Sequence, residues 1–372
     1  MYVSAMLAAA VLVLIMANLT EPGEAAEEIR WYDLTELGVE GKGWTDTESY
    51  YDRLPAKAKG VVRDPVWSLS KNSAGLCARF RTNARVIYAR WSVASANLGM
   101  NHMPPTGMSG VDLYANDPTA MDPRLRWRWI GTGRPERQND NEQAIASGIP
   151  EGDREYILNL PLYNGTVKAE IGVPVSATLE TAVRTGDANK PIVFYGTSIT
   201  QGGCASRPGM AYPAIIGRWL DRPTINLGFS GNGQMEPEMA ALLAELDPAA
   251  FVLDALPNND AIGVTQRLEP LVMKIREAHP DTPILLVENI SYQAGWLLPA
   301  PRDSYMSKNK ALRDAYARLL AAGVPGLHYV PGEDLLGGDA EATVDGTHPT
   351  DLGFWRQALV LEPVLRAVLQ AR

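Results

Sequence analysis

Basic residues and cysteines are scarce in this sequence. Its 372 residues contain 34 Lys and Arg against 43 Asp and Glu, which gives a formal net charge of −9. Nucleic-acid binding relies on clustered cations that face phosphates, so this balance argues against a DNA or RNA partner. The only two cysteines, Cys77 and Cys204, lack the CxxC spacing of a metal site, and whether they pair as a disulfide stays open.

A long apolar run occurs at the N-terminus. It extends almost unbroken from Ala5 to Ala17, and the small residues Ala25 and Ala26 follow. Such a run is too short to span a bilayer comfortably and is typical of a signal peptide. No Lys or Arg precedes it, so an uncleaved anchor is the alternative. We expect residues 1–26 to direct export to a secreted or periplasmic location, with no stable membrane partner after cleavage.

Short strands and turns, without a long helical period, make up residues 29–185. The segment Val86–Val93 is rich in β-branched and aromatic residues, and Trp127 and Trp129 alternate with arginines as in a strand with one apolar face. Asn164-Gly165 lies between two apolar runs and predicts a β-hairpin. We therefore expect this half to form a β-sandwich domain of the jelly-roll type.

Strand–helix alternation follows in residues 190–372. The pattern predicts a mainly parallel five-stranded sheet with helices on both faces. The expected strands are Ile192–Tyr195, Thr224–Leu227, Ala250–Asp254, Ile284–Glu288 and His328–Val330. The expected helices are Tyr212–Leu220, Pro237–Glu245, Thr265–Ala278, Ser307–Ala322 and Leu352–Leu369. Sites in such sheets form beyond the carboxyl ends of the strands.

Three of these strand ends carry residues suited to acyl transfer. Ser198 follows the first strand in a tight glycine-containing turn, where its hydroxyl could act as a nucleophile or merely cap a turn. Gly231 follows the second strand and could direct its backbone N–H at an oxyanion. Pro257-Asn258-Asn259-Asp260 follows the third, and one of its asparagine amides could donate into the same space.

Asp345 and His348 complete this set near the C-terminus. Of the four histidines, only His348 has an acid three residues before it in a turn-forming loop. At that spacing the carboxylate can orient the imidazole, which leaves the other ring nitrogen for a serine. No step of such a reaction requires a metal or a cofactor, and we expect neither.

The blocks resemble those of the SGNH (GDSL-like) hydrolases in kind and in order, over about Lys190 to Leu369. The variant GTSITQGG, with PNN and DGTHP, is similar to a bacterial subgroup with an extra N-terminal β-domain marked by Gly-x-Asp-Leu-Tyr. Gly110-Val111-Asp112-Leu113-Tyr114 matches that motif. The resemblance implies a flavodoxin-like α/β/α catalytic domain and a carboxylic ester hydrolase, and some relatives are carbohydrate acetyl esterases.

Two departures from the commoner pattern bear on the site. Thr197 replaces the aspartate before the nucleophile, and Pro257-Asn258-Asn259-Asp260 replaces the usual Gly-x-Asn-Asp block. The oxyanion hole implied by the resemblance is made by Ser198, Gly231 and Asn258, with Asn259 as the alternative register.

The substrate expected from these features is a short-chain ester, acetyl above all, on a small molecule or a polysaccharide. His102, shortly before the GVDLY motif, could line the cleft or simply belong to a sandwich loop. A thioesterase or acyltransferase with the same triad and a catalytically silent glycan-binding protein are the alternative functions. The sequence does not indicate an oligomeric state.

Overall fold

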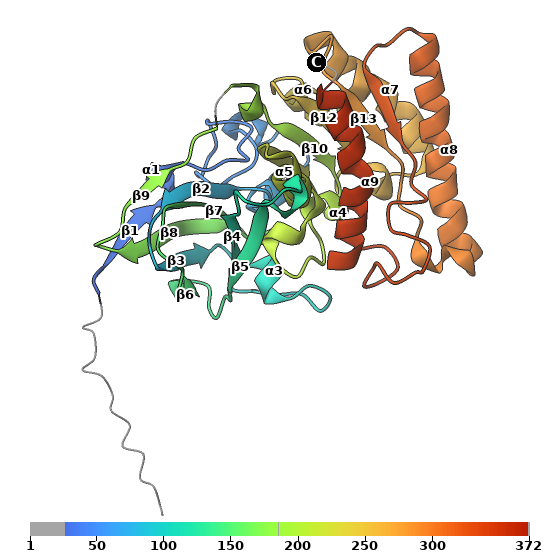
Figure 1. Cartoon of the computed structure of the whole chain (residues 1–372). Helices are drawn as coiled ribbons and strands as arrows, with labels where there is room; N and C mark the ends of the chain where they lie inside the picture. Colours follow the sequence, from blue (N-terminus) through green and yellow to red (C-terminus); the bar gives the residue numbers. More distant parts are fainter. Residues whose placement is uncertain (1–26, 185, 371–372) are drawn as a thin grey trace, which may run out of the picture.

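Two units make up the fold, a β-sandwich and a three-layer α/β/α unit (Figure 1). The computed structural model describes residues 27–184 and 186–370, so the expected signal peptide at residues 1–26 lies outside the described residues. Within the described ranges, no helix is both long and apolar enough to cross a membrane.

The β-sandwich consists of two antiparallel sheets that share one core. The first sheet has the order β1 (Ile29–Asp33), β8 (Thr166–Pro174), β3 (Val86–Val93), β6 (Asn141–Ser147). The second has the order β5 (Trp127–Gly133), β4 (Val111–Asn116), β7 (Arg154–Asn159), β2 (Cys77–Thr82), β9 (Leu179–Thr181). Apolar residues of both sheets, such as Trp91 and Phe80, form that core, which confirms the predicted β-rich architecture.

The predicted hairpin at Asn164-Gly165 is wrong, because β7 and β8 belong to different sheets. The connection between them crosses the sandwich. The side chain of Asn164 is nearly inaccessible and bridges to another loop, accepting from the backbone N of Ser95 at 2.9 Å and donating to its carbonyl at 3.0 Å. Asn164-Gly165 therefore does not form a two-residue turn. It belongs to a crossover connection whose geometry is set by tertiary contacts.

Trp127 and Trp129 share one face of β5, as predicted, because the pairing with β4 runs in regular register from one tryptophan to the other. Trp127 is buried, whereas Trp129 is 49% exposed. Beyond Trp129 the register shifts, since Tyr114 pairs with Trp129 but Leu113 pairs with Gly131, so Ile130 is an extra residue in β5. The bulge therefore does not separate the two tryptophans, which differ only in how far the rest of the protein covers their common face.

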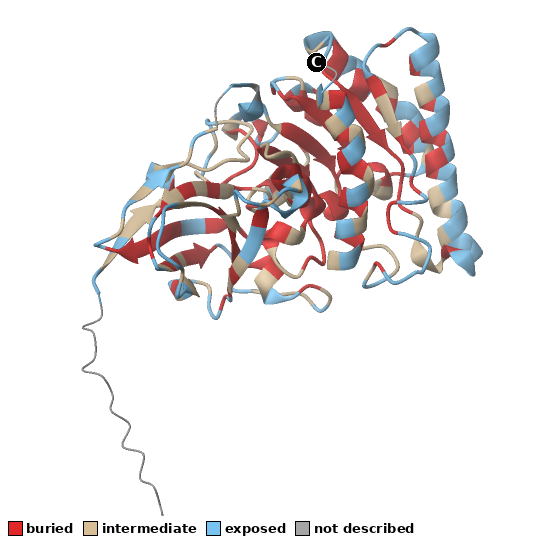
Figure 2. Ribbon diagram, in the orientation of Figure 1, coloured by how far each residue is buried: buried red, intermediate tan, exposed pale blue. Residues whose placement is uncertain are grey.

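Five parallel strands form the central sheet of the second unit, as predicted. Their order is β11 (Thr224–Gly228), β10 (Ile192–Gly196), β12 (Ala250–Asp254), β13 (Ile284–Val287), β14 (Leu327–Val330). Figure 2 shows that these strands are almost wholly buried. Consecutive residues of β10 point to opposite faces, so Val193 and Tyr195 enter one core and Ile192 and Phe194 the other.

Helices cover both faces of this sheet. One face packs against α5 (Tyr212–Leu220) and α9 (Asp351–Gln370), and the other against α6 (Pro237–Leu243), α7 (Ala261–Ala278) and α8 (Pro299–Ala321). The shorter helices are α1 (Leu34–Leu37), α2 (Asp64–Ser70), α3 (Pro105–Met108) and α4 (Ser198–Gln201). The 3₁₀ turns are η1 (Ala56–Ala58), η2 (Pro123–Leu125), η3 (Gly186–Asn189), η4 (Pro208–Met210), η5 (Leu256–Asn258) and η6 (Gln293–Trp296). The helix α8 begins well before the predicted Ser307, because a proline in the first turn loses no intrahelical hydrogen bond.

The segment between β1 and β2 packs against the second unit, although it comes before most of the sandwich in the chain. Leu54, Val62 and Val66 join the core on the α6–α7 face of the parallel sheet. Arg53, only 2% exposed, donates to the carbonyls of Asn226 at 3.0 Å and Gly228 at 2.8 Å. This arginine therefore links the N-terminal half to the carboxyl end of β11.

We expect Arg53→Met to destabilise the protein strongly. The guanidinium also donates to the carbonyls of Leu69 and Asn72, and each acceptor left unpaired in the interior costs about 1–3 kcal/mol. The free energy of unfolding in urea should fall by about 3 kcal/mol or more. The matched control is Arg85→Met, at an exposed arginine with one distant ion pair to Glu151, which should change it by less than about 0.5 kcal/mol. Equal effects of the two substitutions would contradict this account.

Candidate active site

Ser198 lies at the first position of α4, directly beyond the end of β10. Thr197 caps this helix, its hydroxyl accepting from the backbone N of Ile199. Gly196 is required at the preceding position, since a Cβ there would lie 2.0 Å from the hydroxyl oxygen of Thr200 and 2.4 Å from the carbonyl oxygen of Asp254. The strand therefore turns sharply into the helix and holds the Ser198 side chain, with the residue 6% exposed, at the carboxyl edge of the sheet.

His348 and Asp345 lie across from this serine, on the loop that precedes α9. The Oγ of Ser198 is 2.9 Å from Nε2 of His348, and Nδ1 of His348 is 2.7 Å from Oδ2 of Asp345. With Nδ1–H donating to the carboxylate, the Nε2 lone pair faces the serine hydroxyl. The structure thus brings together all three residues that the sequence analysis singled out as a triad.

Local hydrogen bonds hold the Asp345 carboxylate in this position. Its Oδ1 accepts from the backbone N of Thr347 at 3.0 Å and of His348 at 2.7 Å. Gly346, which lies between Asp345 and Thr347, has a φ of +88°, which a residue with a Cβ adopts poorly. Burial raises the pKa of the Asp345 carboxyl, but the hydrogen bonds from His348 and Thr347 outweigh it, so the pKa lies below its ordinary value. The carboxylate is therefore ionised at neutral pH.

The other two expected oxyanion donors follow β11 and β12, the strands that flank β10 in the sheet. Gly231 has a φ of +70° and open space where a Cβ would stand. Among the described residues, neither its backbone N–H nor that of Ser198 has a hydrogen-bond partner. Both groups are thus available to a ligand.

The two candidate asparagines differ in their contacts. Asn259 is 7% exposed, and its amide donates to the carbonyls of Gly233 at 3.2 Å and Ala255 at 2.7 Å. Asn258 accepts from the backbone N of Gly233 through Oδ1, which leaves its amide nitrogen without a partner among the described residues. The amide of Asn259 is therefore engaged in the fold, whereas that of Asn258 is free.

A pocket of about 460 Å³ lies over His348 and is walled by both halves of the chain. The N-terminal half contributes His102, Met103 and Tyr163, and the second unit contributes Gly203, Cys204 and Ser230. The ring of His102 meets that of His348 edge-on, with centroids 5.8 Å apart. Its Nδ1 is 2.9 Å from Oδ1 of Asn101, so Nε2 remains for a ligand. The expected position of His102 at the cleft thus agrees with this geometry.

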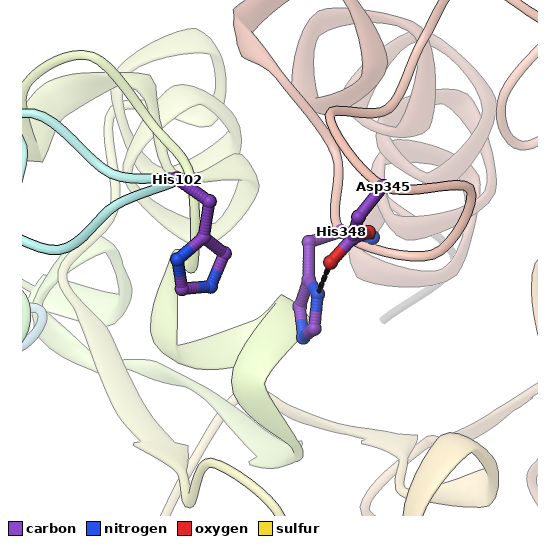
Figure 3. A group of neighbouring side chains, drawn as sticks. All are labelled: His102, Asp345 and His348. Carbon is purple, nitrogen blue, oxygen red and sulfur yellow. Dashed lines mark hydrogen bonds and ion pairs between the residues drawn. The ribbon is translucent and has the colours of Figure 1, made fainter.

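Figure 3 shows His102 facing His348, with Asp345 behind it. The atoms through which these three residues could bind a metal lie within 4.8 Å of one another. His348 and Asp345 already share a hydrogen bond. A cation there would therefore compete with the hydrogen bonds that link Asp345, His348 and Ser198. The two cysteines, Cys77 and Cys204, are free thiols.

Comparisons with known proteins show to which family this fold belongs. Residues 189–366 match the GDSL-like lipase/acylhydrolase family, and residues 29–179 match the N-terminal domain of SGNH-hydrolase-type esterases. A crystal structure of a Bacteroides ovatus protein described as a GDSL-like lipase is 35% identical, with a TM-score of 0.85, covering 92% of this chain and 98% of that one. The chain belongs to the GDSL-like lipase/acylhydrolase family.

Two more distant members of the comparison share the fold. The salicylyl-acyltransferase SsfX3 of a tetracycline biosynthetic pathway is 21% identical, with a TM-score of 0.74, over 92% of this chain and 99% of its own. A family two carbohydrate esterase from Clostridium thermocellum, solved with cellohexaose, is 13% identical, with a TM-score of 0.55, over 80% and 95%. The curated proteins gave no match. The fold is thus shared with structures described as a carbohydrate esterase and as an acyltransferase.

Two residues that the sequence analysis did not single out, Tyr163 and Gln201, brace this site. The hydroxyl of Tyr163, in the connection between β7 and β8, donates to the carbonyl of Ser198 at 2.9 Å. Gln201 accepts from the backbone N of Ser230 at 3.0 Å and donates to the carbonyl of Leu162 at 3.1 Å. Gln201 stands within the GTSITQGG block and could have been suspected there, whereas nothing near Tyr163 in the sequence marks it.

Asp254 is a third missed residue, buried below the turn that carries Ser198. It ends β12 opposite Gly196 and accepts from the hydroxyl of Tyr212 at 2.9 Å and the amide of Gln357 at 3.2 Å. Burial raises the pKa of its carboxyl to about 7, against the opposing effect of these hydrogen bonds. The folded protein therefore retains a proton on Asp254 at pH values where the unfolded chain has lost it.

This raised pKa predicts that Asp254 weakens the fold as the pH rises. Its effect should grow from about pH 4, where the carboxyl of the unfolded chain ionises, to about pH 7. Relative to the parent, Asp254→Asn should gain about 2 kcal/mol between pH 5 and pH 8, since each pH unit between the two pKa values is worth about 1.4 kcal/mol. Urea unfolding of both proteins at the two pH values measures this gain, and a constant difference between them would refute it.

Substitution by alanine should have different effects at Asn258 and at Asn259. We expect Asn258→Ala to lower kcat on p-nitrophenyl acetate about 100- to 1000-fold with little change in stability, as for the loss of one oxyanion donor. Asn259→Ala should instead lower the free energy of unfolding by about 1–3 kcal/mol, because it leaves two buried carbonyls unpaired. Steady-state kinetics and urea unfolding of the same preparations decide, and the reverse pattern would assign the donor to Asn259.

Proposed function

We propose that this protein is an exported serine esterase that hydrolyses short acyl esters, with acetyl esters of carbohydrates as the expected class. The observation that carries the proposal is the row of hydrogen bonds from Ser198 through His348 to Asp345. A nucleophile, a base and an orienting acid in this order are the minimum for acyl transfer at neutral pH.

In the proposed reaction, Ser198 attacks the ester carbonyl while Nε2 of His348 takes the hydroxyl proton. The ionised Asp345 accepts from Nδ1–H throughout and stabilises the imidazolium that forms. The same imidazolium then protonates the leaving alcohol, and an acyl-serine remains. Water, deprotonated in turn by His348, releases the acid and restores the hydroxyl.

The negative charge on the tetrahedral oxygen needs donors that are in place beforehand. We assign this role to the backbone N–H groups of Ser198 and Gly231 and to the side-chain amide of Asn258. Their lack of partners among the described residues supports the assignment. The engaged amide of Asn259 argues against the alternative register.

The pocket beside this row supports a small acyl group or a sugar hydroxyl as its occupant. Its volume of about 460 Å³ is moderate, and Met103 and Tyr163 give it apolar walls. Nε2 of His102 lies free at its side, where it could accept from a hydroxyl of the substrate. Relatives described as carbohydrate esterases make an acylated sugar the favoured substrate.

An acyltransferase is the second candidate, favoured by the similarity to the salicylyl-acyltransferase. Both reactions pass through the same acyl-serine and differ only in whether water or an alcohol accepts the acyl group. Product analysis in the presence of an alcohol distinguishes them. A catalytically silent glycan-binding protein is the third possibility, and it would not react with a fluorophosphonate.

Replacement of Ser198 tests the proposal directly. Ser198→Ala should abolish p-nitrophenyl acetate hydrolysis and fluorophosphonate labelling without loss of the folded state, since the nucleophile alone is removed. The control is Ser68→Ala, at a serine that lines the same pocket, which should retain labelling. Acetate release from acetylated polysaccharides then identifies the substrate class. Turnover by Ser198→Ala at the parent's rate would overturn the assignment.

A further inference from the structure

A second hollow, of about 790 Å³, lies between the sandwich and the segment that follows Cys204. One wall consists of Trp129 and Thr132 of β5 and of Arg134, the residue that follows this strand. Another wall consists of Ser206 and Arg207. Most of its lining side chains are polar. The proposed reaction uses none of them, so the hollow calls for a separate explanation.

Trp129 presents its indole to this hollow in a fixed orientation. Trp129 is 49% exposed and lies just before the extra residue Ile130 of β5. The indole Nε1 donates to the hydroxyl of Thr132 at 3.0 Å, and the guanidinium of Arg207 lies 5.4 Å from the ring centroid. A large aromatic side chain held in this way is prepared to receive a flat apolar surface.

The GVDLY motif holds Arg207 at this position. Asp112, which is inaccessible to solvent, accepts from Nη1 of Arg207 at 2.8 Å and from the backbone N of Gly209 at 3.1 Å. The hydroxyl of Tyr114 also contacts Arg207. The Asp and Tyr of the motif thus fix a cation beside Trp129, which is a built feature of the sandwich and not a chance surface contact.

The linings of this hollow and of the active-site pocket come from the same two segments of chain. Ser206 and Arg207 follow Cys204, which lines that pocket, and Thr106 follows His102 and Met103, which also line it. Thr106 donates through its hydroxyl to the carbonyl of Ser206 at 2.6 Å, so the two segments are joined. A chain-like ligand could therefore lie in both hollows at once.

We propose that this hollow is a binding subsite for the sugar units that neighbour the acylated unit of a polysaccharide. A sugar ring has an apolar C–H face, which suits the indole of Trp129, and a rim of hydroxyls. Arg134 and Glu136 line the hollow with no ion-pair or hydrogen-bond partner for their side chains among the described residues, so they supply a donor and an acceptor for those hydroxyls. This inference rests on the proposed function, because the acylated unit must then lie beside Ser198.

Removal of the indole is the test. For Trp129→Ala, the KM for an acetylated polysaccharide, divided by the KM for p-nitrophenyl acetate, should rise about tenfold or more. The polymer is chosen from acetylated xylan, glucomannan and pectin as the one that the parent deacetylates fastest. The matched control is Trp296→Ala, at a tryptophan of η6 that is 77% exposed and lies outside both hollows; its ratio should not change. Trp129→Phe should fall between parent and Trp129→Ala.

The remaining outcomes distinguish failure of the subsite from failure of the esterase proposal. An unchanged ratio for Trp129→Ala, or a parent that cleaves p-nitrophenyl acetate but none of the three polymers, overturns the subsite and leaves the esterase proposal standing. A parent inactive on every ester overturns the esterase proposal instead. In that case calorimetric titration with oligosaccharides of the same three polymers still tests the subsite, which fails if parent and Trp129→Ala bind them equally.

Discussion

The site depends on one geometric constraint: three neighbouring parallel strands, β11, β10 and β12, end at the same edge of the sheet. Gly231, Ser198 and Asn258 follow these three strands, so segments far apart in sequence are brought to one edge of the sheet. The loop before α9 then needs only to reach this edge for His348 to come within 2.9 Å of the serine. Parallel strands with right-handed crossovers produce such a meeting point as a general property of open α/β sheets.

The N-terminal half is structurally part of this site. Arg53 binds the carbonyls at the end of β11, and Tyr163 binds the carbonyl of Ser198 itself. The contacts of Arg53 are buried, where a hydrogen bond that is lost is not replaced by water. The position of the nucleophile and of the neighbouring turn therefore depends on residues that belong to neither the Gly-x-Ser block nor the Asp-x-x-His block.

Sequence patterns did not predict the structure where contacts with distant segments of the chain determine it. Asn164-Gly165 has the composition of a hairpin turn, yet it lies in a crossover connection, where Asn164 forms hydrogen bonds with the backbone of Ser95. Trp127 and Trp129 alternate with arginines and share one face of β5, yet only Trp127 is buried, because the rest of the protein covers that face unevenly. In both places the pattern in the sequence is local, and tertiary contacts decided the outcome.

By itself, the sequence determined the strand–helix alternation, the parallel sheet and the set of residues that could carry acyl transfer, because hydrophobic periodicity and short motifs are local properties. Its preference for Asn258 over Asn259 rested on the resemblance alone, and it contained no sign of Arg53, Tyr163 or the buried carboxyl of Asp254. Only the tertiary structure showed the contacts of these residues. Which amide is free, and which charge is buried, depends on the partners that packing brings within reach, and these partners come from segments more than a hundred residues apart in the case of Arg53 and β11.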